Sequence, residues 1–147
     1  MQHIEEIYPK PSSPCNCMNI RRASRAVTQF YDKVLAPSGL TVSQFGLLRH
    51  IPVAGQVSIT ELAKLIRIDR TTLNRNLKPL KENTLITITP GKDPRVKEIA
   101  LTESGEAAVQ NGCLLWEAAQ TDMREYFGEP DLRLLNQFMA KLEALAP

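Results

Sequence analysis

The stretch IDRTTLNRNLKPLKENTLI, residues 68–86, decides how the rest of the chain is interpreted. Leu73, Leu77 and Leu80 recur at the spacing of one narrow stripe on an α-helix. Polar residues cover the opposite side and its flanks: Thr71, Thr72, Asn74, Arg75 and Lys78. Such a polar side is typical either of a helix that only meets solvent or of a helix that reads base edges and holds phosphates. The choice between the two depends on the surrounding sequence.

Length and composition indicate one soluble globular domain. The chain has 147 residues, of which 43% are hydrophobic and 23% charged. It has no apolar run near the roughly 18 residues that a membrane span requires, and its start, MQHIEEIYPKPSSP, lacks the pattern of a signal peptide. Three cysteines without an export signal favour a reducing compartment. We therefore expect a cytoplasmic protein without a membrane partner.

The net charge of +2 conceals an uneven distribution of charge. Residues 64–97 hold nine lysines and arginines against three acidic residues, a local balance of +6. The rest of the chain has nine basic and thirteen acidic residues, a balance of −4. This asymmetry favours the docking of a polyanion to one part of the surface, although charge alone also fits a coincidental cluster.

The residues before the basic segment predict an arm and two helices. Prolines and serines in residues 1–16 indicate an extended or loosely ordered arm, and apolar residues at helical spacing predict a first helix over about residues 17–35. Thr41 and Gln44 have the spacing of a capping box, in which each side chain bonds the backbone of the other residue. A second helix should therefore run from there to about Ile51.

A second capping box introduces a helix-turn-helix. Ser58 and Glu61 predict a short helix that ends shortly before Asp69, which caps the next helix. Two short helices joined by about three residues are typical of a helix-turn-helix, whose second helix normally enters the major groove of DNA. Pro79 removes one backbone hydrogen bond from that second helix. Because the leucine spacing continues past it, we expect a bent helix that reaches about Glu82.

A β-hairpin follows the helix-turn-helix. The alternating, β-branched stretches 84–89 and 96–101 predict two strands. The loop between them carries Lys92, Asp93 and Arg95. The hairpin therefore has a charged and mainly basic tip.

Two further helices complete the chain. Thr102 is expected to cap a long helix over about residues 103–127, which contains Gly112, and Asp131 to cap a final helix. The final helix has a broad apolar face: Leu134, Leu135, Phe138, Met139, Leu142 and Leu145. An exposed face of this size favours a dimer, and packing within its own subunit is the alternative.

A helix-turn-helix followed by a basic-tipped hairpin resembles the MarR family of bacterial and archaeal transcriptional regulators. The matching stretches are LTVSQFGLL, SITELAKLI, DRTTLNRNLKPLKENTLI, DPR in the hairpin and IALTESGEAAV after it, so that the resemblance covers roughly residues 17–146. It implies a mainly α fold with a small β-hairpin wing, a winged helix-turn-helix plus a helical dimerisation region. The single domain would span residues 17–147, with a DNA-binding lobe at 41–101 and dimerisation helices at 17–36 and 103–147. The resemblance further implies an obligate homodimer that binds double-stranded DNA.

The resemblance also implies which residues of the helix-turn-helix meet DNA. Those in its second helix are Arg70, Thr71, Thr72, Asn74, Arg75 and Lys78. Arg75 is the first choice for guanine, because a guanidinium can bridge O6 and N7, and Asn74 can pair with adenine in a similar way. The two threonines suit a phosphate or a thymine methyl group. Ser58 and Thr60, at the start of the preceding helix, suit phosphate.

In the hairpin, Asp93 and Arg95 match the D-x-R pattern of the family's wing. The resemblance implies that Arg95 enters the minor groove, preferably a narrow A·T-rich one, while Asp93 steadies it. Lys92 is assigned to DNA binding with them. The alternative is a flexible charged hairpin tip without a role in DNA binding.

Two triggers for the release of DNA stay open. By resemblance, a small apolar or phenolic molecule would enter a crevice between the dimerisation and DNA-binding lobes. Candidate residues for this crevice, which are also of types that are commonly structural, are Arg21, Arg25, Tyr31, His50 and Trp116. Cys15 and Cys17 resemble the oxidation switch of some family members, and inert thiols are the alternative. Their spacing without a second pair argues against zinc, and we expect no metal and no cofactor.

We interpret the chain as a transcriptional regulator, most simply a repressor, that binds a pseudo-palindromic operator. A winged-helix module that binds protein rather than DNA is the first alternative, and it predicts that the basic segment contributes nothing to function. A small enzyme is disfavoured, because the sequence has no glycine-rich phosphate loop and no recognisable nucleophile–base pair.

Overall fold

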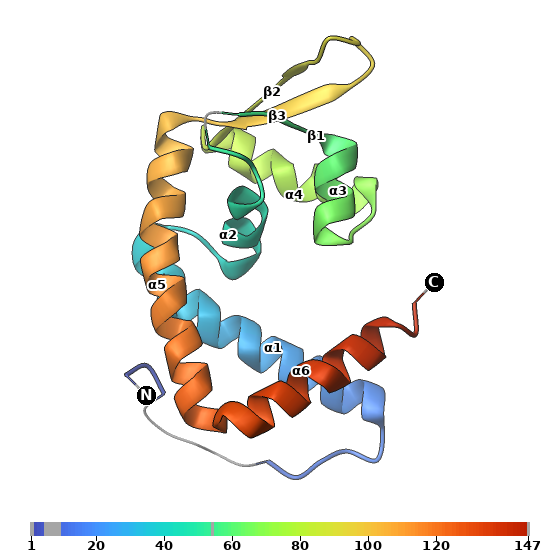
Figure 1. Cartoon of the computed structure of the whole chain (residues 1–147), viewed down its shortest axis with the longest axis vertical. Helices are drawn as coiled ribbons and strands as arrows, with labels where there is room; N and C mark the ends of the chain where they lie inside the picture. Colours follow the sequence, from blue (N-terminus) through green and yellow to red (C-terminus); the bar gives the residue numbers. More distant parts are fainter. Residues whose placement is uncertain (1, 5–9, 54, 147) are drawn as a thin grey trace.

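The computed structural model describes residues 2–4, 10–53 and 55–146, and within them the protein is mainly helical (Figure 1). The helices are α1 (Asn16–Leu35), the short 3₁₀ helix η1 (Ala36–Ser38), α2 (Val42–Arg49), α3 (Ile59–Ile66), α4 (Arg70–Glu82), α5 (Glu103–Phe127) and α6 (Glu129–Glu143). The strands are β1 (Val57–Ser58), β2 (Ile86–Pro90) and β3 (Lys97–Leu101). At one end of α5, the winged lobe consists of α2, α3, α4 and the strands; α1, α5 and α6 form the helical region. The expected mainly α fold with a small β wing is confirmed.

The leucine stripe of residues 68–86 packs into the centre of the winged lobe. Leu73, Leu77 and Leu80 of α4 are all buried. They share a core with side chains from α2, α3 and the sheet: Phe45, Leu48, Leu62, Ile86 and Ile99. Because the apolar side of α4 faces this core, its polar side faces outwards.

Side-chain caps set where the helices of the winged lobe begin, as the spacing predicts. The amide of Gln44 donates to the hydroxyl of Thr41 (3.2 Å), and the amide of Thr41 donates to Oε1 of Gln44 (3.0 Å). Ser58 and Glu61 make the same reciprocal pair at the start of α3. Both capping boxes are therefore confirmed, and α4 reaches Glu82, as predicted.

The wing is a three-stranded antiparallel sheet in the order β1-β3-β2, one strand more than the predicted hairpin. β1 contains only Val57 and Ser58, too few residues for a sequence alternation to be recognised. The predicted strand over 84–89 is wrong at its start, because Thr84 has a left-handed backbone with φ of 56° and β2 begins at Ile86. β3 pairs with β1 on one side and with β2 on the other.

The long helix α5 contributes to two cores. Its buried Gly112 meets the ring of Phe45, where a β-carbon would lie 2.6 Å from Cδ2 of the ring. This close approach explains a glycine inside a helix, where glycine is otherwise unfavourable. Further along α5, Ala119 packs with Tyr31 and Val34 of α1 in a second, smaller core.

The last helix starts earlier than predicted and buries none of its described residues. α6 begins at Glu129 with Gly128 as its N-cap, so the prediction that Asp131 caps the helix is wrong. Gly128 adopts a φ of 75° that suits the turn after α5, and Pro130 has the backbone geometry of a first helical turn. Asp131 therefore lies inside the first turn.

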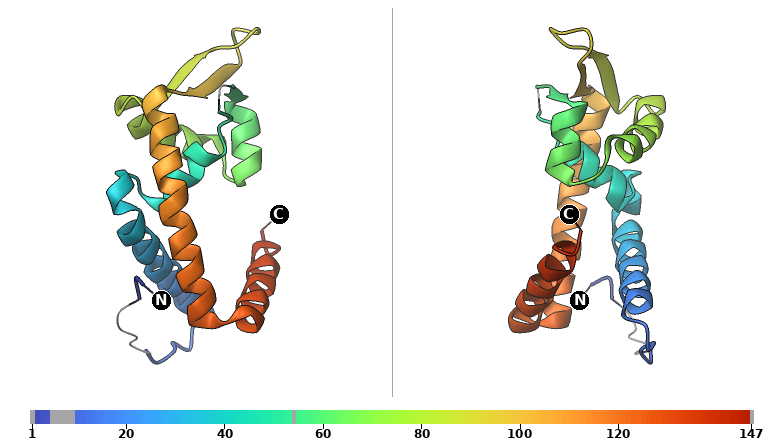
Figure 2. Two further views of the ribbon diagram at one scale, coloured as in Figure 1. Left: turned by 60° about the vertical axis from the view of Figure 1, so that its left-hand side comes forward. Right: turned by 90° about the vertical axis from the view of Figure 1, so that its right-hand side faces the viewer.

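Large apolar side chains of α1 and α6 stay exposed in the single chain. They are Met18, Ile20, Val27, Leu134, Phe138 and Met139. Figure 2 shows α1 and α6 on either side of the lower half of α5, away from the winged lobe. Within the described residues, no helix combines the length and the apolar character that crossing a membrane requires.

The start of the N-terminal arm is anchored on α5. The amides of Gln2 and His3 donate to the carboxylate of Asp122 at 2.9 and 2.6 Å, and Nδ1 of His3 lies 3.1 Å from Oδ2. Asp122 is only 3% exposed. The arm predicted over residues 1–16 is thus held at its described start, and its residues 5–9 lie outside the part of the chain that the structure describes.

Candidate nucleic-acid interface

The outward side of α4 carries most of the residues assigned to DNA. Five of them are exposed: Arg70, Thr71, Asn74, Arg75 and Lys78. Nζ of Lys78 lies 3.9 Å from Oε1 of Glu82, one turn further on, and both side chains stay mostly in solvent. The helix therefore presents cationic, amide and hydroxyl groups to the outside while its leucines hold it on the lobe.

Thr72 is placed differently from its neighbours on α4. It is half-buried, its hydroxyl donates to Oδ2 of Asp69 at 2.6 Å, and its amide donates to Oδ1 at 2.8 Å. The hydroxyl, followed by the amide, holds the pKa of Asp69 below its usual value. Thr72 thus completes the N-cap of α4, and its assignment to DNA stays a prediction.

The two residues assigned to phosphate at the start of α3 also differ from one another. The hydroxyl of Ser58 donates to Oε2 of Glu61 at 2.8 Å and accepts from the amide of Glu61 at 3.1 Å. The Ser58 hydroxyl, followed by the Ser58 amide, holds the pKa of Glu61 below its usual value. Thr60 is exposed beside a cleft that α3 forms with the end of α6.

At the tip of the wing, Asp93 holds Arg95. Nε of Arg95 donates to Oδ1 at 3.2 Å, Nη2 donates to Oδ2 at 3.1 Å, and the Arg95 amide donates to Oδ1 at 3.0 Å. The guanidinium, followed by the amide, keeps the pKa of Asp93 below its usual value. The Arg95 side chain is still 91% exposed, and Lys92 beside it is exposed too. The predicted contact is present, and the entry of Arg95 into a groove stays a prediction.

These elements have close counterparts in known regulators. Residues 38–95, which span the helix-turn-helix and most of the wing, match the model of the MarR family. The chain is 37% identical to the M. tuberculosis transcriptional regulator MosR, whose crystal structure in complex with DNA superposes with a TM-score of 0.76 over 90% of this chain and 99% of that one. The chain belongs to the MarR family. A MarR mutant from E. coli, crystallised with operator DNA, is 23% identical with a TM-score of 0.71 over 89% of this chain and 99% of that one, a likeness that shows the fold alone.

A curated relative matches over a shorter region. The uncharacterised HTH-type regulator YwoH of Bacillus subtilis is 28% identical over 87 residues, which are 59% of this chain and 64% of YwoH. As a MarR-family member, the protein is a DNA-binding transcriptional regulator and not an enzyme. The winged helix-turn-helix inferred from the sequence is confirmed, and every residue assigned to DNA lies within the matched region 38–95.

Of the five residues assigned to an effector crevice, the structure brings two into one core. Tyr31 is buried in the second core, and Trp116 packs against both cores. Burial raises the pKa of Tyr31 above its usual value. His50 is exposed, with Nδ1 2.6 Å from a backbone carbonyl of α2, and Arg21 and Arg25 are exposed on the first half of α1. The crevice stays a prediction.

Arg49, which no sequence pattern singles out, stacks on Trp116. Its Cζ lies 4.1 Å from the centre of the Trp116 ring and 6.0 Å from the centre of the Phe45 ring. A guanidinium over an indole is a favourable cation–π arrangement. The contact joins α2 to α5, and a lone arginine at a helix end is too common a feature to have indicated it.

Cys15 and Cys17 are exposed free thiols at the start of α1. The amide of Cys15, the N-cap residue, donates to Oγ of Ser13 at 3.2 Å, and Ser13 is fixed by two 2.8 Å hydrogen bonds with the Asn19 side chain. Cys113 is half-buried against the core of the winged lobe. No group of three or more His, Cys, Asp or Glu side chains among the described residues could hold a metal ion. The redox role of the first two cysteines stays a prediction.

Proposed function

We propose that the protein binds a pseudo-palindromic operator as a homodimer and represses transcription. The observation that carries this proposal is the exposed polar side of α4, together with a wing tip on which Asp93 holds Arg95. A symmetric dimer presents two such surfaces. Half-sites about 10 base pairs apart let both recognition helices enter successive major grooves. MosR, crystallised with DNA, and E. coli MarR, crystallised with operator DNA, support the proposal.

In this proposal α4 reads the bases. The guanidinium of Arg75 contacts O6 and N7 of a guanine, and the amide of Asn74 pairs with an adenine. Thr71 contacts a thymine methyl group or a phosphate, and Arg70 and Lys78, which lie towards the two ends of α4, hold phosphates. All five side chains are already exposed, which supports these roles, because none of them would have to leave the core to contact DNA.

Other residues assigned to DNA fix the positions of the backbone amides at the starts of α3 and α4. Thr72 fixes the start of α4 through Asp69, and Ser58 fixes the start of α3 through Glu61. The backbone amides at these helix starts then point towards phosphate. Thr60 adds an exposed hydroxyl to the same edge.

The wing contacts the neighbouring minor groove. The two side-chain hydrogen bonds from Arg95 to Asp93 reduce the number of conformations that the guanidinium can adopt before DNA binds. A narrow A·T-rich groove has an enhanced negative potential that attracts such a group. Lys92 supplies a further phosphate contact from the same loop.

The homodimer is supported by the apolar side chains that one chain leaves exposed. On α1 and α6 they are Met18, Ile20, Val27, Leu134, Phe138 and Met139, and Leu145 follows just after α6. Covering them with a second copy gains about 25 cal/mol for each Å² of apolar surface removed from water. α6 needs such cover most, because it buries no described residue of its own and short isolated helices are marginal in water.

Release of DNA is proposed to follow a chemical signal, for which the two triggers make different predictions. If an oxidant acts through the exposed Cys15 and Cys17, oxidised protein should run as a covalent dimer on a non-reducing gel. Changing Cys113 to Ser should leave this response intact, and changing both other cysteines should abolish it. If peroxide alters neither gel mobility nor DNA binding, the cysteines are structural and a small apolar or phenolic molecule becomes the leading trigger.

A salt-titrated gel-shift assay with promoter DNA of the protein's own gene tests operator binding. Several cationic side chains in each subunit should make affinity fall steeply with salt, with a log–log slope of about −0.9 for each phosphate neutralised. A scrambled duplex of equal length is the control and should bind more weakly at every salt concentration. Absence of binding, or binding insensitive to salt, would contradict the proposal and favour a winged-helix module that binds protein.

A further inference from the structure

Arg67, in the turn between α3 and α4, has a backbone conformation that favours glycine. Its φ is 54° and its ψ is 47°, and it is the left-handed C-cap of α3. Helices commonly end on glycine in this conformation, because a β-carbon makes it unfavourable. An arginine here suggests that its side chain has a task that glycine could not perform.

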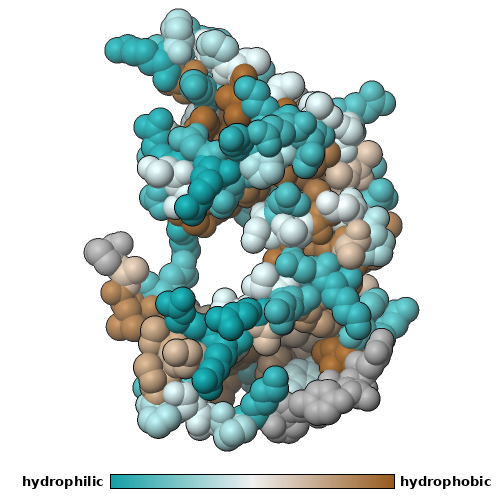
Figure 3. All heavy atoms as spheres, turned by 180° about the vertical axis from the view of Figure 1, so that it is seen from behind, coloured by the Kyte–Doolittle hydropathy of each residue, from teal (hydrophilic) through white to brown (hydrophobic). Residues whose placement is uncertain are grey.

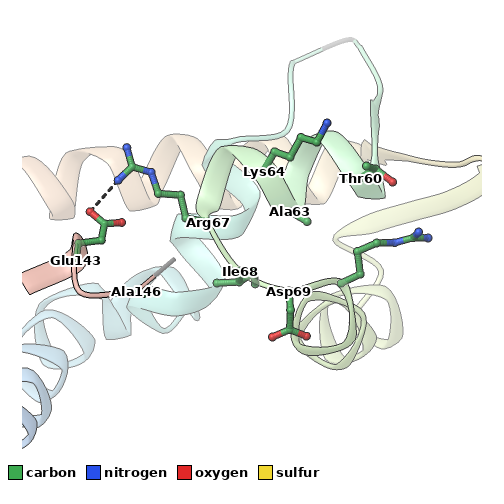
Figure 4. A pocket seen from close by; sticks show the side chains of 9 residues that line it. Thr60, Ala63, Lys64, Arg67, Ile68, Asp69, Glu143 and Ala146 are labelled. Atoms are coloured by element: carbon green, nitrogen blue, oxygen red, sulfur yellow. Dashed lines mark ion pairs between the residues drawn. The ribbon is translucent and has the colours of Figure 1, made fainter.

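The Arg67 side chain makes an ion pair with the last residue of α6. Nη1 of Arg67 lies 2.7 Å from Oε2 of Glu143. Figure 4 shows the two side chains pointing towards each other, whereas those of Lys64 and Thr60 are directed away from the pair. The contact therefore joins the helix-turn-helix to the C-terminal end of the helical region.

This contact lies on the side of the winged lobe that α5 does not support. The lobe is joined to the helical region through η1 and α5, and Figure 1 shows α3 and the α3–α4 turn on the side of the lobe away from α5. Between that turn and the end of α6 lies a cleft of about 680 Å³, to which Arg67 and Glu143 both contribute. Seen from behind in Figure 3, an opening passes between the two parts of the molecule, and a narrow column of hydrophilic atoms connects them beside it.

We propose that Arg67 and Glu143 are positioning residues for operator binding. Their ion pair holds the unsupported side of the winged lobe at a fixed distance from the helical region. α4 begins three residues after Arg67, so the same contact fixes where the recognition helix stands relative to the dimer axis. The pair thereby sets the spacing between half-sites that the protein accepts.

The role is one of position rather than of stability. The side chains of Arg67 and Glu143 are 73% and 56% exposed, and exposed ion pairs contribute little to folding. A lobe attached on one side only can tilt if α5 bends between the two cores to which it contributes, which leaves both cores intact. A weak contact on the opposite side is therefore sufficient to favour one orientation among several of similar free energy.

The experiment rests on the proposed binding of a dimer to an operator. Affinity is measured for duplexes whose half-sites lie at the preferred spacing and at one base pair less or more. The variants are Arg67→Gly, Glu143→Gln and the two together. Selectivity is the ratio of the affinity for the preferred spacing to the affinity for the altered spacings. In each variant this ratio should fall by about twofold to thirtyfold, the range in which mutations usually alter coupling between distant sites. The double variant should lose no more than either single variant, because all three remove the same contact.

Two controls match the variants. Among the described residues, Thr84 is the other non-glycine position with a left-handed backbone, and it does not line the cleft, so Thr84→Gly should leave spacing selectivity unchanged. Glu129→Gln removes the same charge from the opposite end of α6 and should also leave it unchanged. Arg67→Gly removes the β-carbon that makes the left-handed backbone at position 67 unfavourable. The melting temperature of this variant should therefore stay near or above that of the wild type. Loss of folding is therefore not the expected cause of its altered selectivity.

The outcomes separate this proposal from the proposed function. If the wild type binds all spacings alike or binds no DNA, operator binding by a dimer is wrong. If the wild type is selective and Arg67→Gly and Glu143→Gln are equally selective, the positioning role is overturned. It is also overturned if Arg67→Gly alone weakens binding and lowers the salt slope by about 0.9 for each subunit, because Arg67 would then contact a phosphate itself.

Discussion

The winged lobe and the helical region use their apolar residues in opposite ways. In the lobe, Phe45, Leu48, Leu62 and the three leucines of α4 are at most 2% exposed. In the helical region, α6 buries no described residue, and α1 buries only residues in its last turns. The lobe thus completes its core within one chain, whereas the helical region leaves an apolar surface to be covered.

This difference separates the two tasks of the protein. Because the lobe is stabilised from within, its outer polar side is free to contact DNA without cost to its core. The apolar side chains on the surface of α1 and α6 contribute to stability only when another surface covers them and removes them from water. Mutations in the two regions should therefore fail in different ways.

The largest effect is expected from Leu77→Ala in the lobe. Leu77 is 1% exposed, and emptying such a position costs about 2–5 kcal/mol of unfolding free energy. The loss should be the same at low and high protein concentration in urea titrations. Phe138→Ala, in the exposed face of α6, should instead give a loss that higher protein concentration reduces, because it weakens association. If both losses are independent of concentration, the contrast between the two regions is wrong.

A smaller effect is expected on the outer side of the lobe, where function and stability should separate. Arg75→Ala should cost about 1–3 kcal/mol of binding free energy and relax the preference at one base position, with the melting temperature unchanged. Arg95→Ala should weaken binding and reduce the preference for an A·T-rich flank. Binding to a panel of operator variants distinguishes the two. An equal loss on every sequence for both variants would contradict base readout by Arg75.

The smallest effect is expected from Asp122, the one carboxylate that is buried among the described residues, and only in acid. Burial by itself would raise the pKa of Asp122, but the amide of His3, then the amide of Gln2 and the ring of His3, outweigh it, and the pKa is lowered from 3.8. A lowered pKa contributes stability that is present above pH 3.8 and is lost as pH falls below it through the lower folded-state pKa.

Asp122→Asn should therefore flatten the acid end of the stability curve, measured by urea titration at several pH values. His3→Ala keeps both amide donors to Asp122 and should retain most of the slope of stability against pH in acid. A slope unchanged in Asp122→Asn would show that the arm does not hold the carboxylate in solution.

Much of the winged lobe could be predicted from the sequence because its determinants are local. Leucines at helical spacing and capping boxes three residues apart act within one or two turns, and the structure confirms them. The errors occur where local patterns are silent or ambiguous. β1 is two residues long, Thr84 takes a left-handed backbone without being glycine, and Gly128 begins a helix for which Asp131 is an equally plausible cap.

For the candidate site, the sequence was sufficient to predict which side chains of α4 are exposed and which residues cap the helices. It was not sufficient to predict contacts between residues far apart in the chain. The outward side of α4 follows from its buried stripe, and the Asp93–Arg95 contact is local to the wing. The contacts of Arg67 with Glu143 and of His3 with Asp122 join residues far apart in the chain, where no spacing rule applies. Position 67 also holds an arginine instead of the glycine that usually marks a left-handed helix end in a sequence.

The most direct test of this account is the mass of the wild-type protein in solution, measured by sedimentation equilibrium across a range of concentrations. The account predicts the mass of two chains, with dissociation and unfolding favoured together on dilution, because α1 and α6 need a second copy to cover their apolar faces. The mass of one chain at every concentration, with α1 and α6 still folded, would contradict it.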